Sequence, residues 1–241
     1  MKAKKKIVVT VSGGMDSAVL LYMAVQQVGE ENVYPLFFNY GQRHLKELEY
    51  AQELVQNLLT KDLKEVDVKF IRELAPVSSL TNDDIDTPNV EEVMGEAQPK
   101  SYVPFRNLMF LSICTSYAES IGAEEVWYGA TQVDSLAGYW DAEETFVKKV
   151  NQVIKLNREN KIKVVALLLD MNKADIVLKG IKLKVPFDKT YTCYSGELPA
   201  DATSASSSLR IKGFLMAGLI DPMQYKQDLT ETWQKHNCKV I

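Results

Sequence analysis

The sequence has few cysteines and no long apolar run, and these shortages exclude several classes of protein. Cys114, Cys193 and Cys238 form no paired framework, so we expect a reducing, cytoplasmic location rather than a disulfide-stapled secreted domain. No apolar stretch approaches the roughly 20 residues that a membrane-spanning helix requires. The basic residues 1–6 precede an apolar run, 7–11, that is too short for the core of a signal peptide.

The chain also lacks an excess of positive charge. Its net charge of −4 argues against an extended nucleic-acid surface, so no direct nucleic-acid partner is expected. Its 241 residues, 46% of them hydrophobic, suffice for one sizeable core. We interpret residues 1–190 as the main domain and residues 191–241 as a small C-terminal appendage packed on it. No internal repeat is present.

The order of apolar patterns indicates alternating strands and helices. Short β-branched runs that end in small residues are typical of buried strands, and apolar positions at helical spacing separate them. The prediction is an α/β fold with a Rossmann-like open, mostly parallel sheet, helices on both faces and a small C-terminal helical appendage. The strands are expected at 7–11, 33–39, 66–71, 125–130 and 164–169, and the helices at 17–28, 47–59 and 107–121.

Two segments lack periodicity. Residues 75–100 gather prolines and acids and predict a loop over the ligand edge of the sheet, or a disordered segment. Residues 200–208 are almost wholly small and polar, which is typical of a flexible connection.

A glycine-containing loop, Ser12-Gly13-Gly14-Met15-Asp16-Ser17, follows the first predicted strand. Glycine amides at the start of a helix form an anion site, where the helix dipole favours phosphate. Asp16 would repel phosphate directly, so it either caps the helix or holds a Mg²⁺ ion that bridges phosphate oxygens. The alternative is a glycine turn with an ordinary cap. Neither a Walker loop nor a dinucleotide fingerprint is present. The motif resembles the signature loop of the N-type ATP pyrophosphatases, which implies ATP cleavage between the α and β phosphates.

Polar residues also follow the second predicted strand, at the edge where open α/β sheets bind ligands. Arg43 is a candidate phosphate clamp, whereas His44 alone is equally consistent with a solvated residue. With the glycine loop, two motifs resemble the 7-cyano-7-deazaguanine synthase family: Phe38-Asn39-Tyr40-Gly41-Gln42-Arg43-His44 and Val103-Pro104-Phe105-Arg106-Asn107-Leu108. Further similarity lies at Gly129, Asp134, Gly138-Tyr139, Phe146-Val147, Asn172-Lys173-Ala174, Thr192-Cys193-Tyr194 and Leu209-Arg210.

The resemblance implies an ATP-dependent ligase that adenylates 7-carboxy-7-deazaguanine and converts it with ammonia, through the amide, to the nitrile. ATP and Mg²⁺ are the expected cofactors, and a homodimer is expected. Asp16, Arg43, Arg106 and Lys173 are the expected catalytic residues: the three cations could neutralise developing phosphate charge, and Asp16 could hold the Mg²⁺ ion. Arg106 could instead pair with an acid of the 75–100 loop, and Lys173 could lie on a solvated helix face. ATP is assigned to Ser12, Gly13, Gly14, Met15, Asp16, Ser17 and Gly129, and the substrate to Gln42, Arg106, Asn107, Asp134 and Tyr139.

The sequence departs from the family at its zinc site, which is normally built from four cysteines. Only Cys193 remains, and the other three positions are Asp201, Ser204 and Ser207. Zinc prefers thiolate and imidazole ligands, so no zinc is expected.

The substrate loop departs as well. Glu143 stands where the family has an arginine, which reverses a charge near a site meant for a carboxylate. The identity of the acid and the amine, and a product that stops at the amide, therefore stay open. Another amide-forming or tRNA-modifying ATP pyrophosphatase is the alternative enzyme, and an inactive nucleotide-binding module is the alternative of another class.

Overall fold

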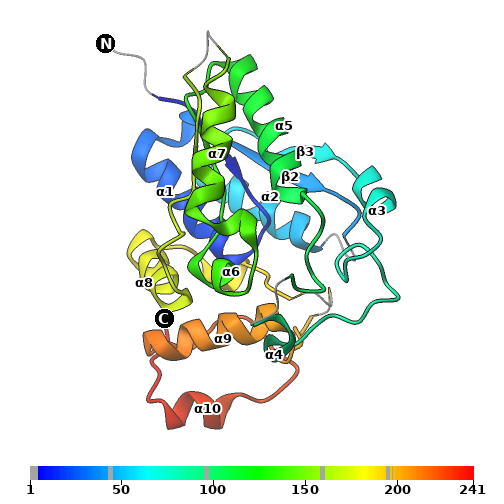
Figure 1. Ribbon diagram of the computed structural model, residues 1–241. Coiled ribbons are helices and arrows are strands. Elements are labelled where there is room, and N and C mark those ends of the chain that lie inside the picture. Colours follow the sequence, from blue (N-terminus) through cyan, green and yellow to red (C-terminus); the bar gives the residue numbers. More distant parts are fainter. Residues whose placement is uncertain (1–4, 43–45, 95–97, 158–160, 194–195, 197) are drawn as a thin grey trace.

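A five-stranded, all-parallel sheet forms the centre of the protein in a computed structural model that describes residues 5–42, 46–94, 98–157, 161–193, 196 and 198–241 (Figure 1). The strand order is β3-β2-β1-β4-β5. The parallel pairing confirms the predicted α/β class. The strands are β1 Ile7–Thr10, β2 Val33–Asn39, β3 Lys64–Asp67, β4 Glu125–Trp127 and β5 Lys163–Val165.

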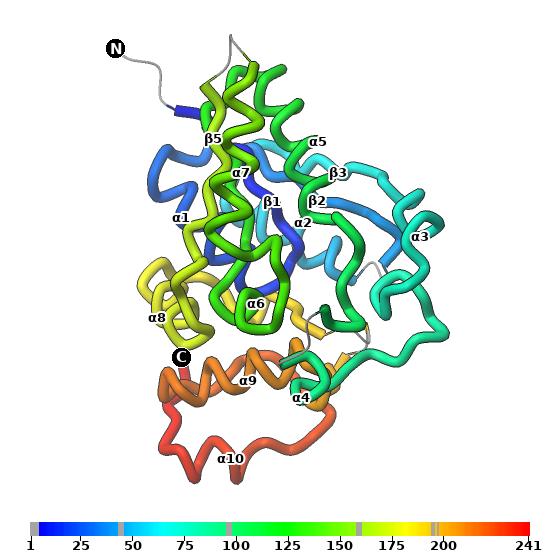
Figure 2. The backbone as a smooth tube through the Cα atoms, viewed as in Figure 1, coloured from blue at the N-terminus to red at the C-terminus, as the bar shows by residue number. Residues whose placement is uncertain are grey.

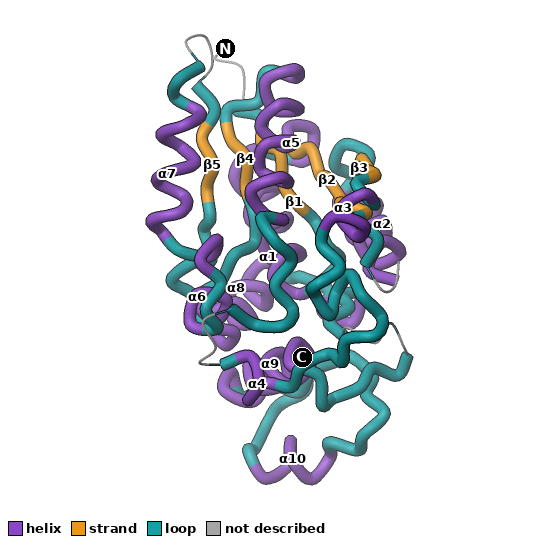
Figure 3. Tube along the Cα trace, turned by 45° about the vertical axis from the view of Figure 1, so that its right-hand side comes forward, coloured by secondary structure: helices purple, strands orange, loops and turns teal. Residues whose placement is uncertain are grey.

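The central strand β1 shows why the sheet is covered on both faces. Ile7, Val8 and Val9 are all completely buried, and alternate residues of a strand point to opposite faces. Ile7 and Val9 pack in the cluster that contains α1, α2 and α8, whereas Val8 packs in the cluster that contains α5 and α7. Helices therefore lie on both sides of the strands, as Figures 2 and 3 show. These helices are α1 Met15–Val28, α2 Lys46–Leu58, α5 Arg106–Ile121, α7 Glu144–Ile154 and α8 Lys173–Leu183.

The last helices of the chain lie beyond the edge of the sheet, next to α8 and α4 (Figure 2). The contact between α8 and α9 is close, because a Cβ atom added to Gly213 would meet the Cβ of Lys173 at 2.7 Å. None of the helices in the described residues combines the length and apolar character needed to cross a bilayer. The remaining elements are α3 Phe70–Leu74, α4 Val90–Val93, α6 Gln132–Leu136, α9 Ala205–Ala217, α10 Thr230–Lys235, η1 Glu30–Asn32, η2 Trp140–Ala142 and η3 Phe187–Lys189.

Several predicted segments are wrong in part. The predicted strands 125–130 and 164–169 are too long, because β4 ends at Trp127 and β5 ends at Val165. The predicted strand 66–71 overlaps only the end of β3, because the Asp67 side chain accepts a hydrogen bond from the Lys69 amide at 3.0 Å and turns the chain into α3. The predicted flexible connection 200–208 runs into helix α9, whose N-cap is Ser204. Ser207 is completely buried, so a polar residue in this segment need not be exposed to solvent. Its hydroxyl donates a hydrogen bond to the Thr192 carbonyl.

The segment 75–100 contains regular structure within its described residues. Helix α4 begins with a capping box in which the Asn89 side chain accepts from the Glu92 amide and the Glu92 side chain accepts from the Asn89 amide. Ser78 and Ser79 are completely buried. The disordered alternative is therefore wrong for this described part.

Candidate functional site

The glycine loop lies at the carboxyl end of β1, as predicted, and leads directly into α1. Gly13 has φ of +80°, and a Cβ atom there would lie 2.3 Å from the backbone oxygen of Glu47, so only glycine fits. Ser17 closes the loop: its Oγ accepts from the Ser12 amide and donates to the Gly14 carbonyl, both at 3.1 Å. The loop is thus held in one shape by its own hydrogen bonds.

Asp16 forms an ion pair with Lys173, 157 residues later in the chain. Lys173 Nζ donates to Asp16 Oδ2 at 2.8 Å, and the two side chains are 13% and 26% exposed. Asp16 does not cap α1, because the N-cap is Gly14 and no side chain caps that end. Lys173 begins α8 but is turned inward, so the solvated-face alternative for this residue is wrong.

The electrostatics of this pair keep Lys173 charged and leave one oxygen of Asp16 without a partner in the described part of the chain. Burial alone would lower the pKa of Lys173, but the charges of Asp16 and Asp134 outweigh burial and hold the pKa above its ordinary value. Lys173 therefore stays protonated beside the loop. Asp16 Oδ1 is buried and has no hydrogen-bond partner among the described residues, which leaves one carboxylate oxygen for a cation.

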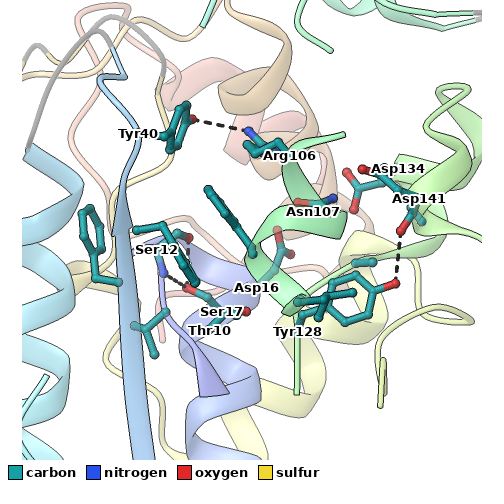
Figure 4. Close-up of a pocket in the computed structure, with 18 of the residues that line it drawn as sticks. Thr10, Ser12, Asp16, Ser17, Tyr40, Arg106, Asn107, Tyr128, Asp134 and Asp141 are labelled. Atoms are coloured by element: carbon teal, nitrogen blue, oxygen red, sulfur yellow. Dashed lines mark hydrogen bonds between the residues drawn. The ribbon is translucent and has the colours of Figure 1, made fainter. Parts of the chain in front are cut away.

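A cavity of about 310 Å³ opens beside the loop, between the carboxyl ends of β1 and β2 and the start of α5 (Figure 4). Its size falls in the range of small-molecule sites. The structure brings together at its wall most of the residues that the sequence indicated. Those that line it are Ser12, Asp16, Ser17, Gln42, Arg106, Asn107, Gly129, Asp134 and Tyr139.

The other predicted residues lie elsewhere. Gly13 and Gly14 contribute backbone to the loop, whereas the Met15 side chain is only 1% exposed and packs in the core, so it offers a ligand no side-chain contact. Arg43 and His44 lie outside the described residues. The phosphate-clamp role of Arg43 stays a prediction.

Arg106, the first residue of α5, lies against two aromatic rings. Its guanidinium is 5.4 Å from the centroid of Tyr40 and 6.0 Å from that of Phe110, and its Nη1 donates to the Tyr40 hydroxyl at 3.4 Å. Burial raises the pKa of Tyr40, while the charge of Arg106 acts in the opposite direction. Figure 4 shows Arg106 across the cavity from Ser12 and Asp16. Arg106 thus supplies a cation to the wall opposite the glycine loop, whereas Lys173 contacts Asp16 and is absent from the described cavity lining.

Two carboxylates of the cavity wall were missed as site residues by the sequence reasoning. Glu47 lines the cavity, and burial raises its pKa to about 7 against the opposing charge of Arg106. Asp141 is 3% exposed and also lines the cavity. The signal for Asp141 was its place in the Tyr139-Trp140-Asp141 substrate loop.

The reversed charge of Glu143 does not reach this cavity. Glu143 is exposed, precedes α7 and is absent from the described cavity lining. The expectation that its carboxylate would oppose a substrate carboxylate is therefore wrong. Glu143 is the extended residue between η2 and α7, and its side chain is exposed to solvent.

The C-terminal part of the chain supports the glycine loop. The Tyr191 amide donates to the Gly13 carbonyl at 2.9 Å, and the Met15 amide donates to Thr192 Oγ1 at 3.4 Å. Arg210, which is fully buried, holds the same segment by donating to the Thr190 carbonyl at 3.1 Å and its Oγ1 at 2.8 Å. The loop therefore rests on residues more than 170 positions away in the sequence.

The positions of the family's four cysteines converge but do not fit zinc. Cys193 Sγ lies 3.7 Å from the Asp201 carbonyl oxygen and 3.9 Å from Ser204 Oγ, and Ser207 donates to the Thr192 carbonyl at 3.0 Å. The Asp201 carboxylate instead accepts from Thr203 Oγ1 at 2.8 Å and from Gln227 at 3.1 Å. One thiol, two hydroxyls and an engaged carboxylate make a poor tetrahedral site. No group of three or more His, Cys, Asp or Glu side chains suited to a metal occurs in the described ranges.

Comparisons with known structures show the fold alone. The NMN synthetase from Francisella tularensis matches with a TM-score of 0.50 at 15% identity over 98% of this chain and 84% of its own. The U34-tRNA thiolase NcsA from Methanococcus maripaludis also matches with a TM-score of 0.50, at 18% identity over 87% of this chain and 65% of its own.

Sequence comparisons show the family. The model of the queuosine biosynthesis protein QueC matches residues 6–218. The 7-cyano-7-deazaguanine synthase of Oceanobacillus iheyensis is 39% identical over 92% of this chain and 98% of its own length. The 7-cyano-7-deazaguanine synthase 2 of Colwellia psychrerythraea is 40% identical over 92% of this chain and 99% of its own. The chain therefore belongs to the QueC family of queuosine biosynthesis proteins, to which the motifs at the cavity pointed.

Proposed function

We propose that this protein is a 7-cyano-7-deazaguanine synthase that adenylates the carboxylate of 7-carboxy-7-deazaguanine with ATP and converts it with ammonia, through the amide, to the nitrile. The observation that carries the proposal is the cavity beside the glycine loop, which is lined by Asp16 and Arg106 and whose Asp16 is paired with Lys173. The names of relatives that cover 92% of the chain support the choice of substrate.

The first step needs a good leaving group on an unreactive carboxylate. A carboxylate oxygen of the substrate attacks the α phosphorus of ATP, the bond to the β-phosphate oxygen breaks, and pyrophosphate leaves. The amides of the glycine loop and the protonated Lys173 offset the charge of the departing pyrophosphate, while Arg106 faces the cavity from the opposite wall.

The second step replaces AMP by nitrogen. Ammonia attacks the acyl carbon, AMP leaves with its electron pair, and a proton from nitrogen passes to a base, which yields the amide. To give the nitrile, the amide oxygen attacks the α phosphorus of a second ATP and pyrophosphate leaves. AMP then departs with that oxygen and its electron pair, while the nitrogen loses its two protons to a base and the carbon–nitrogen triple bond forms. Glu47 is the cavity carboxylate whose raised pKa of about 7 suits proton transfer near neutral pH.

Asp16 fits a magnesium site. Its Oδ1 is buried and without a hydrogen-bond partner in the described structure, and Mg²⁺ typically binds one or two carboxylates together with substrate phosphates. When bound, the ion would neutralise phosphate charge. Lys173 holds the Asp16 carboxylate in place by donating a hydrogen bond to its other oxygen, Oδ2.

The experiment incubates the protein with ATP, Mg²⁺, ammonia and 7-carboxy-7-deazaguanine, and identifies the products by mass while AMP is counted. We expect the nitrile with two AMP per product. One AMP per product with accumulated amide would show an enzyme that stops at the amide. Absence of acid-dependent pyrophosphate release, with another acid supporting it, would favour a different adenylating enzyme of this fold.

A further inference from the structure

Asp141 is a carboxylate held rigidly in the wall of the cavity, away from the glycine loop. It lies in the short helix η2, and its backbone carbonyl accepts a hydrogen bond from the Tyr128 hydroxyl at 3.1 Å. The Ala142 amide donates to the Tyr139 carbonyl at 3.0 Å and closes the same turn. Figure 4 shows Asp141 beside Asn107 and Asp134, on the far side of the cavity from Ser12. The position of this carboxylate is therefore set by the backbone.

The carboxylate of Asp141 keeps acceptor positions for a ligand, because a carboxylate has about four and its own backbone amide and the Asn107 side chain use two. Burial raises the pKa of Asp141, while the charge of Arg106 and these two hydrogen bonds act to lower it. A carboxylate that is 3% exposed receives little solvation from water. Donors on a bound ligand would supply what burial removes.

The other carboxylates of the cavity have different tasks. Asp134 Oδ2 accepts from the Thr131 amide at 2.8 Å and from Thr131 Oγ1 at 2.7 Å, so this side chain closes the capping box of α6. Asp16 is paired with Lys173. Glu47 belongs to the helix that covers Gly13, at the phosphate end of the cavity. Asp141 is left as the acidic group at the opposite end.

A deazaguanine ring presents two donors side by side, the N1–H and the exocyclic 2-amino group. The two oxygens of one carboxylate match this pair, whereas an adenine-like edge presents an acceptor at N1 that a carboxylate would repel. We propose that Asp141 accepts hydrogen bonds from N1–H and the 2-amino group of the substrate ring, and that this contact determines specificity for a guanine-like base. The inference rests on the proposed function for the kind of base, and it assigns the donor edge of the base to Asp141 rather than to Asp134, which was predicted as a substrate residue.

This arrangement gives the substrate a direction. With its donor edge on Asp141, the substituent at position 7, on the opposite side of the bicyclic ring, points back into the cavity. Asp16 and the glycine loop lie in that direction (Figure 4). Tyr139, whose hydroxyl shares a 2.6 Å hydrogen bond with Ser101 Oγ, forms a fixed part of the same wall.

The test compares 7-carboxy-7-deazaguanine with its analogue that lacks the 2-amino group, using calorimetry in the presence of a non-hydrolysable ATP analogue. A hydrogen bond to a charged group corresponds to about a 10- to 100-fold difference in affinity, so we expect the wild type to prefer the complete base by that factor. Asp141→Asn should reduce this preference to within about threefold, mainly by weakening the complete base. The matched control is Glu143→Gln, an acid-to-amide change at an exposed position of the same segment, which should keep the wild-type preference.

Each outcome decides the proposal. Equal binding of both bases by the wild type would overturn it, even if Asp141→Asn did not fold. An unchanged preference in a folded Asp141→Asn protein would also overturn it, and an equal loss in Asp134→Asn alone would return base recognition to Asp134. Preference that depends on Asp141 without any product formation would support the inference while refuting the proposed reaction. A rise only in the KM for ammonia would instead assign Asp141 to the nitrogen donor.

Discussion

Replacing Asp221 by asparagine should destabilise the protein strongly, because Asp221 and Arg210 form a buried ion pair. Both side chains are 0% exposed, and the pair makes two contacts, Nε to Oδ2 at 2.7 Å and Nη2 to Oδ1 at 2.8 Å. Asp221 also accepts from the Tyr225 hydroxyl at 2.6 Å and the Met223 amide at 3.0 Å. The carboxylate therefore satisfies four donors in the interior.

The magnitude follows from what Asp221→Asn removes. Asparagine keeps one acceptor oxygen, turns an NH₂ group toward donors and leaves the Arg210 charge without a counter-charge. Breaking a buried pair in this way costs about 3–5 kcal/mol of unfolding free energy. With an m-value of about 3 kcal/mol/M, the urea midpoint should fall by roughly 1–1.7 M. A chain of this length should lose roughly 6–20 °C in Tm.

The assay is urea unfolding, monitored by tryptophan fluorescence. Trp233 is buried and belongs to the C-terminal segment, so its emission reports on the unfolding of that segment. The control is Glu144→Gln, because Glu144 is 74% exposed and pairs with Lys148 one turn away. That exposed pair contributes at most about 0.5 kcal/mol. If Asp221→Asn shifted the midpoint no more than Glu144→Gln, the Arg210–Asp221 pair would not be what holds the C-terminal segment, and our reasoning would be refuted.

Three further predictions concern the loop, the pH dependence and zinc. Asp16→Asn should abolish pyrophosphate release while far-UV circular dichroism stays near wild type, and retained turnover would reject the metal role of Asp16. Burial raises the pKa of Glu47 from 4.5 to about 7, so the folded state binds its proton more tightly and stability should fall by at most about 3 kcal/mol as pH rises between these values. Glu47→Gln should flatten that pH profile of the urea midpoint, and an unchanged slope would contradict the assignment. Elemental analysis should find well below one zinc per chain, and chelator should leave the unfolding curve unchanged, because Cys193 is the single thiol among the converging positions. Stoichiometric zinc whose removal unfolds the protein would overturn this.

The features that the sequence predicted well are those set by neighbouring residues. The phosphate loop follows from Gly13, which needs a left-handed conformation between a buried strand and a helix start. The alternation of short buried runs with helical stripes predicted the parallel sheet, because burial on both faces leaves that pattern in the sequence. The predicted Asp16 and Arg106 reached one cavity because the carboxyl ends of parallel strands share an edge.

The features that the sequence misjudged depend on contacts between distant segments. Residues 200–208 are polar, yet Ser207 is buried because Thr192 offers its carbonyl as an acceptor. Asp134 and Asp141 are the same residue type and lie near each other in sequence, but only the structure shows that Asp134 closes the capping box of α6 whereas Asp141 lies buried in η2 at the cavity wall. Lys173 contacts Asp16 because α8 packs on α1. Glu143 lies outside the cavity lining because it is the residue at which the chain enters α7. The sequence by itself determined which chemistry the loop can perform, since that depends on local backbone geometry. Only the tertiary structure decided which charged groups meet, because burial and long-range packing select one partner for each.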